Sequence, residues 1–139
     1  MEKHLEKHLE KQIKELQNAI KNFTDSLSLN CNQYDIIAQD TIKSGQVQKF
    51  EFCVELYWKT LKRFIQDTHG FVLKSPKAVI KKGLDLGFYD YKTYETAIGI
   101  INWRNELSHI YKQESFGKIR ILILNSRSVW KTLLTPFVE

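Results

Sequence analysis

Between residues 5 and 27 an apolar side chain recurs at every third or fourth position. The positions are Leu5, Leu9, Ile13, Leu16, Ile20, Phe23 and Leu27, with mostly Lys, Glu, Gln and Asn between them. An α-helix turns by about 100° per residue, so this spacing gathers the apolar side chains into one narrow stripe. The sequence therefore predicts a long amphipathic helix that must pack against at least one other element.

The segment from Gln46 to His69 reads as a second long helix, ended by Gly70 at the usual position of a helix-terminating glycine. Its apolar residues cover a much broader face: Val47, Phe50, Phe52, Cys53, Val54, Leu56, Tyr57, Trp58, Leu61, Phe64 and Ile65. Such a face needs more than one neighbour, so the helix is either central in a bundle or shared with a second subunit. Before it, we expect a short helix from Tyr34 to about Ile42, stopped by Ser44-Gly45.

Three further helices are predicted from their capping signals. Ser75-Pro76 begins a short helix that ends near Gly87, Thr93 is a plausible N-cap for a helix from about Tyr94 to Tyr111, and Ser115 opens a last helix from Phe116 to about Phe137. No segment gives a convincing strand signal. The expected fold is all-α: an antiparallel up-and-down four-helix bundle with an additional short helix, forming a single domain over residues 1–139.

Composition limits the classes of function. The formal charge of +5 permits anionic partners without demanding them, and no run of 18 apolar residues indicates a membrane helix. The charged N-terminus does not resemble a signal peptide, so we expect a cytoplasmic protein. There is no P-loop, GxGxxG, HExxH or zinc spacing, and we expect no cofactor and no metal.

Two smaller features leave alternatives open. His4 and His8 have a spacing that could hold a metal, but solvated residues near a chain end are the favoured interpretation. Cys53 lies among apolar helix residues, where a reduced core residue is expected.

The segment from Arg104 to Tyr111 carries the clearest chemical signal. Arg104 binds phosphate oxygens well, and His109 is a side chain that titrates near neutral pH. On a helical wheel Arg104, Asn105, Ser108 and His109 share a polar side, away from the apolar side of Ile100, Trp103, Leu107 and Ile110. The pattern suggests phosphodiester or nucleotide chemistry. Taken alone, it is better explained by basic residues placed near the end of an ordinary helix.

Three blocks together resemble the nucleotidyltransferase substrate-binding proteins of the HEPN superfamily. The first block runs from Val47 to Lys62 (VQKFEFCVELYWKTLK), the second is Ser75 to Ile80 (SPKAVI), and the third is Trp103 to Tyr111 (WRNELSHIY). The last block contains the Arg-x4-His-x-Tyr motif of that superfamily. The resemblance covers most of residues 46–112 and implies a helical bundle that forms a homodimer and associates with a minimal nucleotidyltransferase.

The resemblance implies two functions for the same residues. In the favoured one the protein is a metal-independent RNase of a toxin–antitoxin-like pair. Arg104 and His109 are then catalytic across a homodimer, and adenylylation of Tyr111 by the partner controls the site. A second His from another subunit is required because one His cannot be both acid and base on one phosphodiester.

The alternative is a non-catalytic subunit that binds a nucleotide or other substrate for the partner enzyme. In both interpretations Asn105 and Ser108 orient phosphate. A plain structural bundle remains a third possibility.

Charged residues outside the motif raise two further questions. Glu51 and Glu55 lie one turn apart in an apolar helix, so we expect at least one to pair with Lys59, Lys62 or Arg104, unless they form an exposed strip. Four lysines near the short helix could face RNA phosphates, although a solvated face is the commoner explanation. They are Lys74, Lys77, Lys81 and Lys82.

Overall fold

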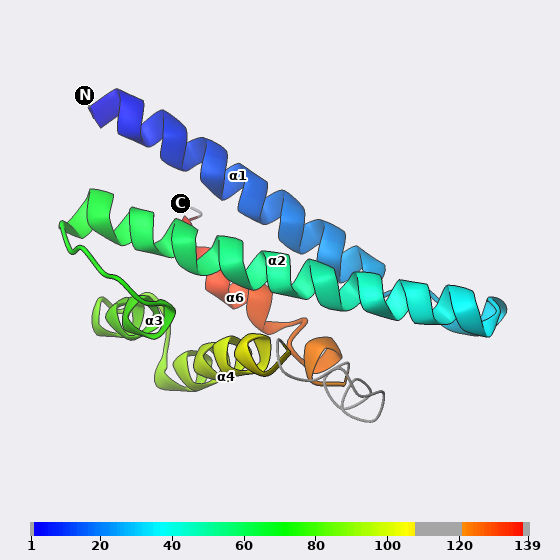
Figure 1. The fold of residues 1–139 in the computed structure, drawn as a ribbon. Helices are drawn as coiled ribbons and strands as arrows, with labels where there is room; N and C mark the ends of the chain where they lie inside the picture. The colour runs from blue at the N-terminus through cyan, green and yellow to red at the C-terminus, as the bar shows by residue number, and fades with distance from the viewer. Residues whose placement is uncertain (1, 108–120, 138–139) are drawn as a thin grey trace.

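The protein is described by a computed structural model that covers residues 2–107 and 121–137, with side chains from residue 7 onward (Figure 1). Its helices are α1 (Glu2–Ser26), α2 (Ile36–His69), α3 (Pro76–Asp85), α4 (Tyr91–Leu107) and α6 (Val129–Leu134), with short 3-10 turns at Cys31–Gln33 and Thr135–Phe137. Residues 121–125 are also helical, and the described ranges contain no strand. The prediction of an all-α bundle is confirmed.

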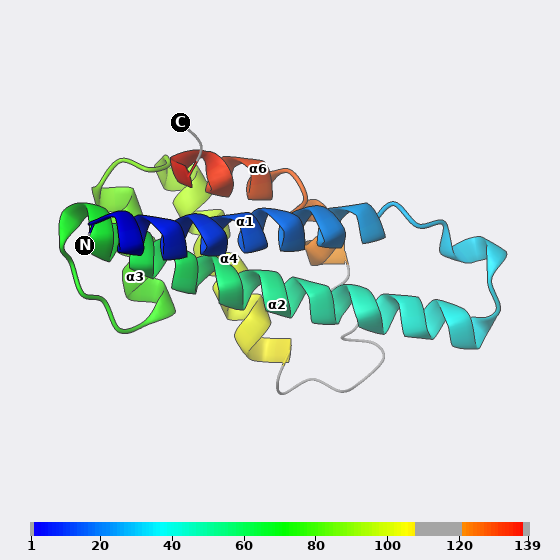
Figure 2. The same cartoon turned by 90° about the horizontal axis from the view of Figure 1, so that it is seen from above.

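Helices α1 and α2 run antiparallel and side by side (Figures 1 and 2). The apolar stripe predicted for α1 is the surface that meets α2. Leu9, Leu16, Ile20, Phe23 and Leu27 are buried and Ile13 is half-buried, whereas the side chain of Leu5 lies outside the described part. The spacing of three and four residues therefore predicted the packing face of this helix correctly.

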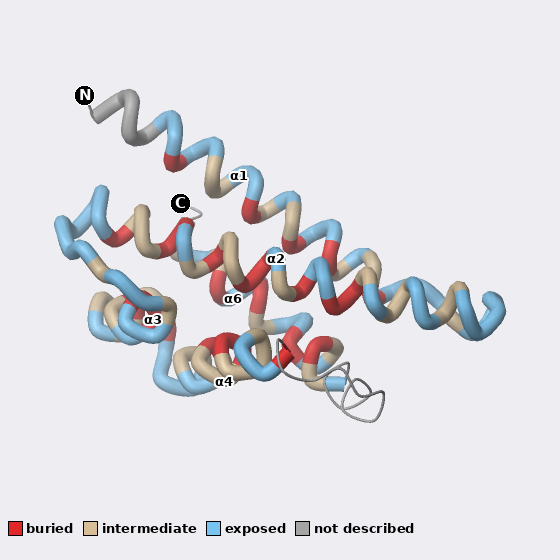
Figure 3. Tube along the Cα trace, viewed as in Figure 1, coloured by how far each residue is buried: buried red, intermediate tan, exposed pale blue. Residues whose placement is uncertain are grey.

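Helix α2 is the centre of the fold. Phe50, Val54, Leu61 and Ile65 on this helix are almost completely buried. Helix α1 covers one side of α2, while α3 and α4 lie on the other (Figures 1 and 3). Helix α6 contacts both long helices, because its Trp130 packs against Phe23 of α1 with ring centroids 6.3 Å apart. Tyr57 packs edge-on against Trp130, with ring centroids 6.2 Å apart. The broad apolar face is thus explained by a central position within one chain.

The predicted break at Ser44-Gly45 is wrong, because α2 continues through both residues. The helix is capped by Asp35, whose Oδ1 accepts a hydrogen bond from Ala38 N at 2.8 Å. Just beyond the glycine, the buried Gln46 side chain donates from Nε2 to Ser26 O at 2.8 Å. A glycine inside a helix lowers the stability of the helix by only about 1 kcal/mol relative to alanine. The flanking helical turns and the Gln46 contact outweigh this cost.

The capping residues were predicted correctly for α3 but not for α4. Ser75 caps α3, since its Oγ accepts a hydrogen bond from Ala78 N at 3.3 Å, and Gly70 ends α2 with φ of +78°. Helix α4 begins at Tyr91, because Asp90 Oδ1 accepts from Thr93 N at 2.8 Å. Thr93 is therefore inside the first turn and is not the N-cap.

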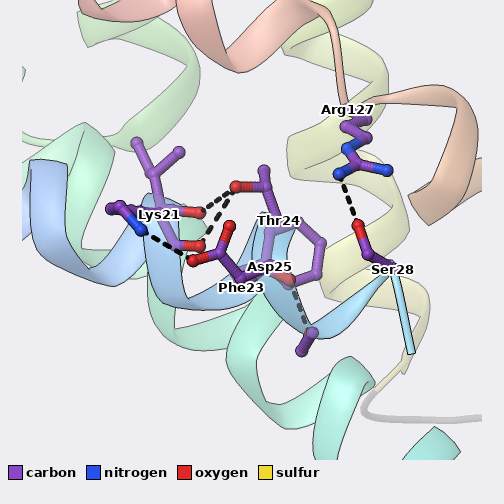
Figure 4. Close-up of polar contacts among 8 residues, drawn as sticks. Lys21, Phe23, Thr24, Asp25, Ser28 and Arg127 are labelled. Atoms are coloured by element: carbon purple, nitrogen blue, oxygen red, sulfur yellow. Dashed lines mark hydrogen bonds and ion pairs between the residues drawn. The ribbon is translucent and has the colours of Figure 1, made fainter.

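The last predicted helix is interrupted where the structure describes it. Residues 126–128 form a turn between residues 121–125 and α6. Ser126 Oγ donates to Ile123 O at 2.7 Å. Arg127 Nη2 donates at 2.7 Å to the Oγ of Ser28, two residues beyond the end of α1 (Figure 4). Hydroxyl bonds to the preceding turn compete with helical continuation. Trp130 and Leu133 are nevertheless buried, as their spacing predicted.

Gly45→Ala is expected to raise the free energy of unfolding by about 0.5–1 kcal/mol. The substitution removes the backbone entropy of glycine inside a helix, and no described atom lies within 4 Å of the new Cβ. Urea unfolding followed by circular dichroism measures the change. Gly70→Ala is the matched control and is expected to destabilise, because its φ is +78°. A loss of stability in Gly45→Ala would contradict a continuous α2.

Candidate functional site

The described part of the Arg104–Tyr111 motif ends at Leu107. Ile100 and Leu107 on α4 are buried, Trp103 and Arg104 are half-buried, and Asn105 is exposed. The predicted division of this helix into an apolar and a polar side is thus confirmed as far as it is described. Three predicted site residues lie outside the described residues: Ser108, His109 and Tyr111.

The guanidinium of Arg104 forms an ion pair between α4 and α2. Its Nη2 lies 2.8 Å from Glu55 Oε2, and the Arg104 and Glu55 side chains are 39% and 33% exposed. The expectation that Glu51 or Glu55 pairs with a nearby cation is confirmed for Glu55. Arg104 therefore extends from α4 toward Glu55 on α2, and its side chain remains accessible to solvent.

Lys59 contacts the other oxygen of the same carboxylate. Its Nζ lies 3.4 Å from Glu55 Oε1, and the two residues are one turn apart on α2. The three side chains carry two positive charges and one negative charge. The cluster of Arg104, Glu55 and Lys59, here called the Arg104 cluster, therefore has one net positive charge and suits an anionic group better than a cationic one.

Sequence reasoning missed a groove of about 460 Å³ between α1 and α2. It is lined by Asn18, Ala19, Asn22, Gln48, Lys49, Phe52 and Cys53. The Lys49 ammonium donates to the Asn22 side-chain oxygen, and Phe52 is 55% exposed. The sequence feature that could have indicated this groove is the pair Asn18 and Asn22, which lie one turn apart beside the apolar stripe of α1.

Cys53 forms part of the floor of this groove and is chemically inert. The residue is almost completely buried, and burial raises the pKa of its thiol to about 12. A thiol with such a pKa stays protonated near neutral pH and is a poor nucleophile. The prediction that Cys53 fills the core is confirmed, and both cysteines are free.

Two of the four lysines near α3 are already engaged within the protein. Lys81 Nζ lies 3.1 Å from Asp85 Oδ1, and Lys82 Nζ lies 4.0 Å from the centroid of the Phe71 ring. Lys74 and Lys77 are exposed. The α3 lysines therefore form a weaker anion surface than their number suggests.

The described residues contain no group of three or more His, Cys, Asp and Glu side chains that could hold a metal ion. Within the same part of the chain, no helix is long and apolar enough to cross a membrane.

The fold and the Arg104 cluster define an all-α protein with a solvent-accessible arginine held between two of its helices. The family model described as "nucleotidyltransferase substrate binding protein like" matches residues 7–127. The chain belongs to this family.

The fold also has a counterpart among solved structures. A crystal structure of a protein from Thermus thermophilus matches this chain with a TM-score of 0.76. The sequence identity is 18%, and the match covers 89% of this chain and 99% of that chain. At this identity the likeness shows the fold alone. No curated protein matches the chain.

The Glu55–Arg104 ion pair is expected to contribute a coupling free energy of about 0.5–1 kcal/mol to folding. Both side chains are partly exposed, so the pair is screened by solvent and the value stays small. The measurement is a double-mutant cycle of Glu55→Ala and Arg104→Ala by urea unfolding. Strictly additive effects of the two substitutions would contradict the contact.

Proposed function

We propose that this chain is the substrate-binding component of a two-component nucleotidyltransferase, in which it binds a nucleotide phosphate through Arg104. The single observation that carries the proposal is the family match over residues 7–127, a range that includes the whole Arg104 cluster. Asn105 and Ser108 are the further residues that orient the phosphate. The nucleotidyl transfer itself belongs to the partner, a minimal nucleotidyltransferase.

The chemistry of the cluster supports this assignment. A guanidinium presents several N–H donors in a planar fork that matches the oxygens of phosphate, and it is charged at any physiological pH. Arg104 extends from helix α4, where Glu55 of α2 contacts its guanidinium, and its side chain is partly open to solvent. A binding subunit needs such a fixed cation, whereas it needs no general acid or base.

The second candidate is a metal-independent RNase of the HEPN type. It is favoured by the complete Arg-x4-His-x-Tyr motif from Arg104 to Tyr111. A homodimer would bring Arg104 and His109 of two subunits together. There Arg104 stabilises negative charge on the phosphate. His109 of one subunit acts as general base on the attacking 2′-hydroxyl, and His109 of the other acts as general acid that protonates the leaving oxygen. Adenylylation of Tyr111 by the partner would then block cleavage, as in a toxin–antitoxin pair.

Arg104→Ala is expected to weaken binding of AMP by roughly tenfold or more, because a hydrogen bond to a charged group is lost. Isothermal titration calorimetry measures the dissociation constant. Arg63→Ala is the matched control, since Arg63 is also ion-paired, with its Nε 3.7 Å from Asp67 Oδ2 on α2. Equal effects of the two substitutions would contradict a specific phosphate site at Arg104.

For the RNase candidate, the purified protein is expected to cleave RNA in excess EDTA, and His109→Ala is expected to abolish the cleavage. The assay follows the appearance of fragments from a labelled single-stranded RNA. The protein must first be shown by mass spectrometry to be unmodified at Tyr111. Absence of cleavage by the unmodified protein would rule out this candidate, and equal cleavage by His109→Ala would indicate a contaminating nuclease.

A further inference from the structure

Glu55 and Lys59 are the residues of the Arg104 cluster that the proposed function does not use, and Glu55 is the one that contacts Arg104. Its carboxylate lies on α2 and reaches across to the guanidinium on α4, 2.8 Å from Nη2. Carboxylate and phosphate oxygens bind the same N–H donors of arginine in the same way. A phosphate that approaches Arg104 therefore meets a guanidinium whose Nη2 is already engaged by Glu55, so a two-point contact that includes Nη2 requires Glu55 to move.

We infer that Glu55 sets the affinity of the Arg104 site, because its carboxylate competes with the substrate phosphate for the guanidinium. When phosphate binds, Glu55 leaves Arg104 and keeps its ion pair with Lys59. The inference rests on the proposed function, because it takes Arg104 as the phosphate-binding residue. It adds two residues, Glu55 and Lys59, to that site.

The geometry makes Glu55 displaceable. The contact with Arg104 joins residues 49 positions apart in the sequence, on two different helices, whereas Lys59 is on the same helix, one turn away. Lys59 Nζ already lies 3.4 Å from the second carboxylate oxygen. When Glu55 leaves Arg104, its charge keeps a cationic partner. The side chain is also one-third exposed, so water can solvate the released oxygen.

The thermodynamic consequence is a reduction in apparent affinity. Substrate binds only the fraction of molecules in which Arg104 is available, so the apparent dissociation constant equals the intrinsic one divided by that fraction. An ion pair between partly exposed side chains holds Arg104 in roughly four molecules out of five. Removal of the competing charge is therefore expected to tighten binding by about fivefold.

Lys59 acts in the opposite direction. It draws Glu55 away from Arg104, so its loss leaves the carboxylate with Arg104 as its one remaining cationic partner in the cluster. Loss of Lys59 is therefore expected to weaken phosphate binding by about twofold. If Glu55 and Lys59 contributed only to stability, loss of Glu55 would not tighten phosphate binding and loss of Lys59 would not weaken it.

The test is calorimetric titration of AMP into the 139-residue protein and four variants. Glu55→Gln keeps the shape of the side chain and removes its charge. Its control is Glu51→Gln, which makes the same charge change one turn earlier on the same helix, at a half-buried residue. Lys59→Gln is controlled in the same way by Lys62→Gln. Circular dichroism and thermal unfolding establish that each variant is folded.

The expected order of affinity is Glu55→Gln above wild type and wild type above Lys59→Gln, each relative to its control. AMP binding by Glu55→Gln that is no tighter than by Glu51→Gln overturns the inference. The proposed function then stands, provided that wild-type binding still depends on Arg104. AMP binding that is absent, or unaffected by Arg104→Ala, overturns the proposed function and the inference with it. If Glu55→Gln does not fold, the Lys59→Gln comparison decides.

Discussion

Burial of the broad apolar face of α2 is the interaction on which the rest of the structure depends. Each fully buried Leu, Ile or Phe side chain contributes about 1.5–3 kcal/mol, and α2 supplies Phe50, Leu61 and Ile65 from one helix. Helix α1 covers one side of this face, and the helices that follow α2 in the chain cover the rest (Figure 3). The chain therefore returns to α2 repeatedly.

The same packing creates the Arg104 cluster. Helix α4 packs with Ile100 and Leu107 buried, which orients its polar side toward α2. Arg104 on that side therefore reaches Glu55, the residue of α2 that also contacts Lys59. The charged residues at the edge of the core are thus fixed by apolar neighbours on both helices. The packing of α4 against α2 therefore sets both the position of Arg104 and its contact with Glu55, which links the packing of the bundle to the proposed phosphate site.

The spacing of apolar residues predicted the buried faces of the helices more reliably than capping signals predicted where the helices begin and end. The stripe on α1, the terminal glycine of α2 and the Ser75 cap of α3 were all evident from the sequence. The errors fell at Gly45, Thr93 and residues 126–128. Near Gly45 and residues 126–128, tertiary contacts such as the Gln46 bond to Ser26 and the Arg127 bond to Ser28 compete with small local preferences. At Thr93 the competing interaction is local, because Asp90 accepts the hydrogen bond from Thr93 N. A preference of about 1 kcal/mol at one residue does not outweigh the packing of a whole helix.

The sequence by itself determined the helical class of this protein, the buried face of its long helices and its resemblance to a family, because these are carried by the spacing and identity of residues within one segment. Only the tertiary structure decided that α2 is continuous and central, that Glu55 is the partner of Arg104, and that a groove lies between α1 and α2. These features join residues far apart in the chain. Their contacts depend on how two helices are rotated against each other, and no local pattern in the sequence specifies that rotation.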